Sequence, residues 1–87
     1  MKFLLVEDEV IQRRLLKDAV SKMGNNDVTE CSNGQEALEL LKKEHFDLVL
    51  MDIHLSDTEM DGIAAARVAH GFYGVPVVFL TADERND

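Results

Sequence analysis

Four apolar runs, separated by more polar stretches, divide the chain. They occupy residues 2–6, 28–31, 47–52 and 75–80. The first, third and fourth runs contain little alternation with polar residues, which is typical of strands buried on both faces of a parallel sheet. The second run alternates apolar and polar residues and is typical of an edge strand. The pattern therefore predicts four strands.

The sequence between these runs carries signals of helices. Over residues 9–23 the apolar residues recur every three or four positions, which predicts an amphipathic helix. They are Ile11, Leu15, Leu16, Ala19, Val20 and Met23. Asn33 followed by Glu36 is typical of a helix N-cap, so a second helix is predicted after Asn33. Residues 63–70 are predicted to be helical by propensity, and residues 71–74 to form a turn.

The predicted elements alternate in the order β-α-β-α-β-α-β. This order is typical of an α/β fold with a doubly wound parallel sheet. With 87 residues, of which 46% are hydrophobic, the chain can build one modest core. We therefore predict a single domain over residues 1–87.

Acidic residues follow two of the predicted strands. Glu7 and Asp8 come directly after the first strand, Asp52 closes the third, and Thr81 follows the fourth. The carboxyl ends of parallel strands meet at one edge of a sheet, where ligands bind in open α/β folds, so we expect these side chains to lie together. Carboxylates held close together raise one another's pKa, and a divalent cation relieves the repulsion. The oxygen-rich set favours Mg²⁺, which often binds beside phosphoryl groups.

Charge and composition narrow the class of protein. Seventeen acidic residues against nine basic ones give a formal charge of −8, which opposes binding to nucleic acid. The single cysteine, Cys31, forms no internal disulfide and indicates a reducing compartment. No apolar run approaches the roughly 20 residues of a membrane span, and the first run is too short for a signal peptide. We expect a cytoplasmic protein that binds neither nucleic acid nor membrane.

The polar positions also match a known family. The Glu7-Asp8 pair, Asp52, the Met-Asp-Gly turn at residues 60–62 and Thr81-Ala82 together resemble the CheY-like receiver domains of bacterial response regulators. The resemblance implies a flavodoxin-like sheet of strand order 2-1-3-4-5. Receivers continue with a fourth helix, a fifth strand that bears an active-site lysine, and a fifth helix. None of these is recognised here, so we expect an incomplete receiver, truncated after its fourth strand.

The same resemblance implies roles for individual residues. Asp52 matches the phosphoacceptor, which attacks a phosphohistidine of a sensor histidine kinase or histidine phosphotransfer protein. The positions that match Mg²⁺ ligands are Asp8, Asp52 and the main-chain carbonyl of His54, with Glu7 acting mostly through water. Thr81 matches the switch hydroxyl, and the Ala82 main-chain amide is expected to contact the phosphoryl group. The metal would neutralise and position the transferred group.

The expected function is signalling in a two-component phosphorelay. Such a domain is not an enzyme for other substrates and catalyses only its own phosphorylation and dephosphorylation. Two alternatives stay open: a pseudo-receiver that serves as a docking module without phosphotransfer, and an aspartate-nucleophile phosphohydrolase. The second expects another aspartate two residues after the nucleophile, where this chain has His54. An exposed fourth strand also predicts a possible homodimer.

Overall fold

The computed structural model describes residues 1–52 and 62–80 and contains one parallel sheet within them. Its strands are β1 (Lys2–Val6), β2 (Asp27–Cys31), β3 (Leu48–Asp52) and β4 (Val77–Leu80). Their spatial order is β2-β1-β3-β4, and all three strand pairs are parallel. The predicted α/β class is confirmed, and the strand order agrees with the flavodoxin-like arrangement.

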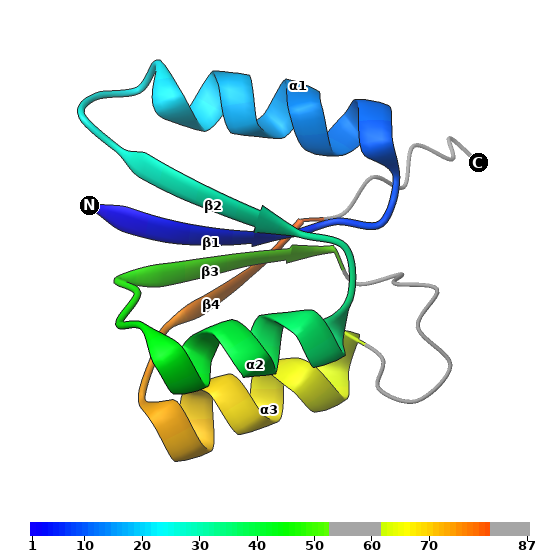
Figure 1. The fold of residues 1–87 in the computed structure, drawn as a ribbon, viewed down its shortest axis with the longest axis vertical. Helices are drawn as coiled ribbons and strands as arrows, with labels where there is room; N and C mark the ends of the chain where they lie inside the picture. The colour runs from blue at the N-terminus through cyan, green and yellow to red at the C-terminus, as the bar shows by residue number, and fades with distance from the viewer. Residues whose placement is uncertain (53–61, 81–87) are drawn as a thin grey trace.

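Three helices connect these strands and cover both faces of the sheet. They are α1 (Val10–Ser21), α2 (Gly34–Lys43) and α3 (Gly62–Tyr73). Figure 1 shows α1 on one face of the sheet and α2 with α3 on the other. Within the described ranges, no helix is both long and apolar enough to cross a bilayer.

The core is divided by the sheet into two clusters. Leu4 and Val6 belong to the larger cluster, which the sheet forms with α2 and α3, whereas Leu5 belongs to the smaller cluster beneath α1. Alternate residues of one strand therefore enter different clusters, as the pleat requires. This explains why β1 is an uninterrupted apolar run: both of its faces are covered.

Helix α1 buries only part of its apolar stripe. Of the six apolar residues predicted for this helix, only Val20 is buried, while Ile11 and Leu15 are 68% and 62% exposed. Leu16 packs at the margin of the smaller cluster. The predicted amphipathic helix is confirmed, but only part of its apolar stripe contributes to the core. The physical reason is that α1 meets the sheet along the side that carries Leu16 and Val20.

Local sequence determines where the other two helices begin and end. Asn33 caps α2 as predicted, because its side-chain oxygen accepts from the Glu36 amide at 2.8 Å. The Glu36 carboxylate returns to the amide of Ser32 at 2.9 Å, one residue before the position expected in a capping box. Helix α3 ends at Tyr73, so it covers the first three residues of the turn predicted at residues 71–74, and Gly74 follows it with a φ of 67° that favours glycine.

Candidate metal centre at the sheet edge

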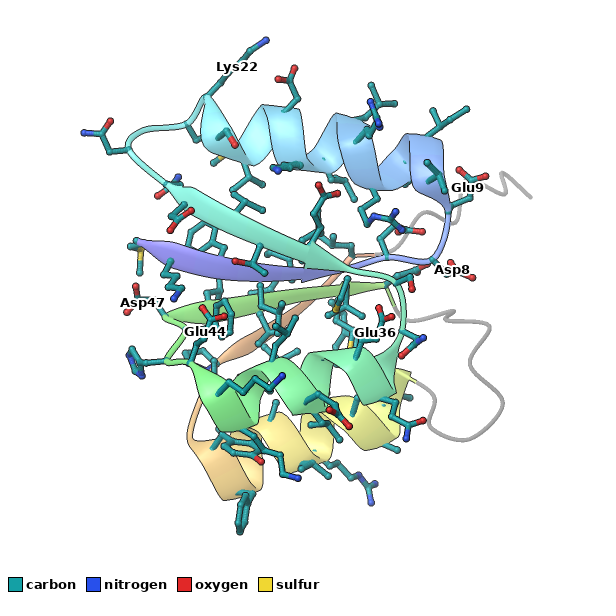
Figure 2. All side chains as sticks on the ribbon, viewed as in Figure 1. Asp8, Glu9, Lys22, Glu36, Glu44 and Asp47 are labelled. Atoms are coloured by element: carbon teal, nitrogen blue, oxygen red, sulfur yellow. The ribbon has the colours of Figure 1, made fainter. Side chains whose placement is uncertain are left out.

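The acidic residues predicted to converge do lie together. In the register of β1 and β3, Val6 is opposite Met51, so the residues that follow them meet at the same edge of the sheet. One carboxylate oxygen from each of Glu7, Asp8 and Asp52 lies within 4.8 Å of the other two. We call these three residues the acidic triad. Figure 2 shows the side chain of Asp8 at the carboxyl end of β1, next to the first turn of α1.

Two members of the acidic triad are buried. Glu7 is 3% exposed and Asp52 is 7% exposed, whereas Asp8 is only partly buried. Glu7 is also held by its neighbours: its amide donates to the Cys31 carbonyl at 3.1 Å, and its carboxylate accepts from the Glu9 amide at 3.1 Å. The triad is therefore built into the end of the sheet rather than displayed on its surface.

Burial and crowding change the acidity of Glu7. The pKa of Glu7 is raised from 4.5 to about 7, chiefly by loss of solvent, with smaller contributions from the charge of Asp52, a hydrogen bond with Asp52 and the charge of Asp8. The hydrogen bond from the Glu9 amide acts in the opposite direction. The site therefore resists carrying three negative charges at once. A divalent cation would compensate them, and three hard carboxylate oxygens are ligands that suit Mg²⁺.

The structure tests only some of the predicted site residues. It brings together Glu7, Asp8 and Asp52, as the sequence predicted. His54, Thr81 and Ala82 fall outside the described residues, so their roles stay predictions. Arg13 was not among the predicted site residues, yet its Nη1 donates to the Glu7 carbonyl at 2.9 Å. Nothing in the helical pattern distinguishes Arg13 from its basic neighbours, because the contact depends on how α1 packs.

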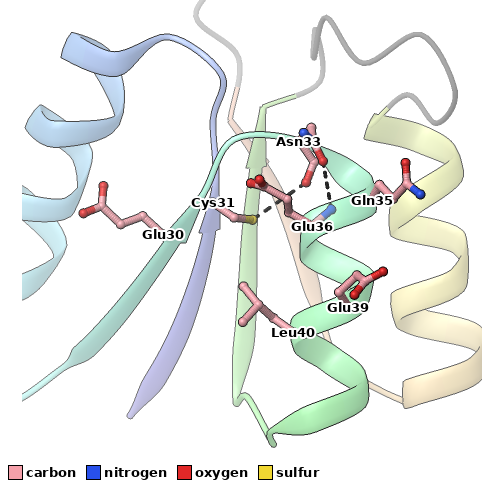
Figure 3. A pocket seen from close by; sticks show the side chains of 7 residues that line it. All are labelled: Glu30, Cys31, Asn33, Gln35, Glu36, Glu39 and Leu40. Carbon is pink, nitrogen blue, oxygen red and sulfur yellow. Dashed lines mark hydrogen bonds between the residues drawn. The ribbon is translucent and has the colours of Figure 1, made fainter.

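The side chain of Cys31 takes no part in this centre. It is buried at the end of β2, beside an open hollow of about 520 Å³ that Figure 3 shows next to the start of α2. Its Sγ lies 3.7 Å from the Asn33 carbonyl oxygen, toward which it can donate. Burial raises the pKa of the thiol to about 12, so Cys31 stays protonated at neutral pH. It behaves as a small core residue and not as a nucleophile or metal ligand.

The raised pKa of Glu7 predicts how stability depends on pH. Without metal, we expect the chain to lose up to about 3 kcal/mol as the pH rises from 4.5 through about 7. The folded state binds the Glu7 proton more tightly than the unfolded chain does. The stability that this proton contributes is therefore complete below pH 4.5 and lost above about pH 7. Thermal unfolding in a chelating buffer at several pH values measures the effect.

Two comparisons isolate the contribution of Glu7. Glu7→Gln stays neutral at every pH and should remove most of the decline. If the triad holds Mg²⁺, the ion would bind the deprotonated carboxylates and should restore stability more at pH 8 than at pH 5. A melting temperature that rises over this range in metal-free buffer would contradict the assignment.

The chain resembles known proteins over nearly all of its length. The model of the response regulator receiver domain family matches residues 3–87. Chemotaxis protein CheY-3 of Vibrio cholerae is 31% identical over 88 aligned positions, which cover the whole chain and 68% of that protein. A protein-glutamate methylesterase/protein-glutamine glutaminase of Hahella chejuensis is 37% identical over 82 positions, 94% of this chain. The chain spans only 23% of the length of that relative.

A solved receiver-domain structure that contains a magnesium ion is also similar to this chain. The receiver domain of a sensor histidine kinase from Pseudomonas aeruginosa PAO1, with a magnesium ion coordinated in its active site cleft, superposes with a TM-score of 0.82 at 29% identity. The match covers 94% of this chain and 67% of that one. Because the family match runs over almost the whole sequence and the fold agrees with it, the chain belongs to the response regulator receiver domain family.

Proposed function

We propose that this chain is a phosphoacceptor module of a two-component phosphorelay, phosphorylated on Asp52 in the presence of Mg²⁺. The observation that carries the proposal is the acidic triad, in which three carboxylates converge within 4.8 Å and Asp52 closes a central strand. Asp8, Asp52 and the main-chain carbonyl of His54 would hold the metal, and Glu7 would act mostly through water. The magnesium ion in the related kinase receiver domain supports this assignment.

The proposed reaction is one displacement at phosphorus. A carboxylate oxygen of Asp52 attacks the phosphoryl group of a phosphohistidine, the new O–P bond forms, and the P–N bond breaks. The bonding electrons leave with the imidazole nitrogen. Bound Mg²⁺ supplies charge neutralisation for the transferred group. The Thr81 hydroxyl and the Ala82 amide would then donate hydrogen bonds to the phosphoryl oxygens.

The proposed partners follow from this reaction. The phosphoryl donor is a sensor histidine kinase or a histidine phosphotransfer protein. The domain catalyses only its own phosphorylation and dephosphorylation. Two proteins similar to this chain are named as histidine kinases, which supports this choice of donor. We propose a cytoplasmic location because the single cysteine, Cys31, indicates a reducing compartment and the proposed donor is a phosphohistidine protein of a phosphorelay.

Phosphorylation by a small donor tests the proposal. The chain is incubated with Mg²⁺ and acetyl phosphate, and its intact mass is measured with and without a chelator. We expect one added phosphoryl group that requires the metal. Release of inorganic phosphate at many turnovers without an adduct would instead indicate a phosphohydrolase. Absence of both adduct and turnover would overturn the proposal and favour a docking module.

The edge position of β4 also supports self-association. Among the described residues no strand pairs with the outer side of β4, where Val78 and Phe79 are 46% and 40% exposed. We propose that two copies pair through this strand, because an unpaired apolar edge favours strand addition. Light scattering should show a dimer that Val78→Lys converts to a monomer. A monomer of 9.8 kDa at high concentration would contradict this pairing.

A further inference from the structure

One arginine connects the acidic triad to the edge of the sheet. Arg13 lies in the first turns of α1 and is partly buried. Its Nη1 donates to the main-chain carbonyl oxygen of Glu7 at 2.9 Å, and its Nε donates to Oε1 of Glu30 at 3.2 Å. Glu30 belongs to β2, the strand next to β1. The guanidinium therefore joins the connection after β1 to the neighbouring strand.

This contact completes the restraint of the segment after β1, which carries two members of the triad, Glu7 and Asp8. The amide, the carbonyl and the carboxylate of Glu7 each have a partner: Cys31, Arg13 and Glu9 respectively. Glu9 is held in turn, since its side chain caps α1 by accepting from the Gln12 amide at 3.3 Å. Asp8 lies between two restrained residues. Its carboxylate position therefore depends on both neighbours keeping their places.

We propose that Arg13 is a positioning residue for the metal centre: it holds Glu7 and Asp8 so that their carboxylates face Asp52. It acts through the Glu7 backbone and touches neither the metal nor the phosphoryl group. The inference rests on the Mg²⁺ binding of the proposed function. A guanidinium suits this role because its planar donors point in fixed directions, whereas an ammonium is a compact point charge.

Lys17 provides an internal comparison for Arg13. It lies one turn further along α1, and its Nζ pairs with the other oxygen of Glu30 at 3.2 Å. Burial would raise the pKa of Glu30, but hydrogen bonds and charges from Lys17 and then Arg13 outweigh it and lower that pKa. Both basic residues thus stabilise the same carboxylate. The contact with the Glu7 carbonyl is what distinguishes the role assigned to Arg13.

Mn²⁺ binding, followed by electron paramagnetic resonance, tests the inference without requiring phosphorylation. We expect Arg13→Gln and Arg13→Lys each to weaken Mn²⁺ binding about tenfold, the effect typical of losing a group that orients a metal ligand. Lys17→Gln should stay within about twofold of the unchanged chain. Asp8→Asn serves as the reference for a site that lacks a ligand. Thermal unfolding in chelator verifies that each variant is folded.

Several results would overturn the inference. Arg13→Gln that binds Mn²⁺ as the unchanged chain does would exclude a positioning role. Full rescue by Arg13→Lys, or an equal loss in Lys17→Gln, would show that charge near Glu30 is sufficient. Arg13→Lys decides the question if Arg13→Gln does not fold, because it retains the charge.

The metal measurement also separates this inference from the proposed function. If the unchanged chain binds Mn²⁺ but acquires no phosphoryl group, the proposed phosphotransfer fails while the role of Arg13 stands. If the unchanged chain binds no Mn²⁺, both fail together.

Discussion

Replacing Asp52 with asparagine is expected to abolish the phosphoryl adduct completely. The neutral amide oxygen is a poor nucleophile, and the variant also loses one of the three carboxylates that would hold Mg²⁺. Both losses act on the same step, so no residual modification of this residue is expected. The measurement is the intact mass after incubation with Mg²⁺ and acetyl phosphate, followed by peptide mapping.

The substitution should leave the fold intact. Asparagine has nearly the shape of aspartate, and its neutrality removes one source of the raised pKa of Glu7. The variant should therefore be as stable as the unchanged chain in metal-free buffer at neutral pH, or more stable. Asp18→Asn is the matched control, because Asp18 is exposed on α1, where it pairs with Lys22 at 3.1 Å. An adduct that persists in Asp52→Asn, or disappears in Asp18→Asn, would contradict the assignment.

Truncating Phe46 to alanine is expected to cost about 4 kcal/mol of folding free energy. Phe46 is 1% exposed and is the largest fully buried side chain among the described residues. Its removal therefore leaves a cavity in the larger core cluster. The Lys2 ammonium lies 5.1 Å from the centre of its ring and loses that contact as well. Small domains are stable by only roughly 5–15 kcal/mol, so the variant should be close to unfolding. Urea denaturation followed by circular dichroism measures the change.

Phe72 offers a control of the same chemistry at an exposed position. It is 78% exposed near the end of α3, and its ring contacts Tyr73 edge-on at 4.9 Å between centroids. Phe72→Ala should change the stability by no more than about 0.5 kcal/mol, as is usual for surface sites. Equal losses in the two variants would show that burial in this fold does not determine the cost.

The sequence alone determined the succession of elements and the three residues of the acidic triad. Uninterrupted apolar runs are typical of strands in a parallel sheet, so β1, β3 and β4 were predictable from residue type. The structure adds that β4 is not covered on both faces, since Val78 and Phe79 are 46% and 40% exposed. The acids at the ends of β1 and β3 were predictable for the same reason, because parallel strands end at a common edge. The cap at Asn33 is likewise a local property of a few neighbouring residues.

The tertiary structure decided what depends on neighbours distant in sequence. Periodicity shows that α1 has an apolar stripe, but only packing determines that Val20 is buried while Ile11 and Leu15 are exposed. The raised pKa of Glu7 and the contact of Arg13 with its carbonyl arise in the same way. Burial, charge proximity and hydrogen-bond geometry are set by which surfaces meet, and a one-dimensional pattern does not contain those distances.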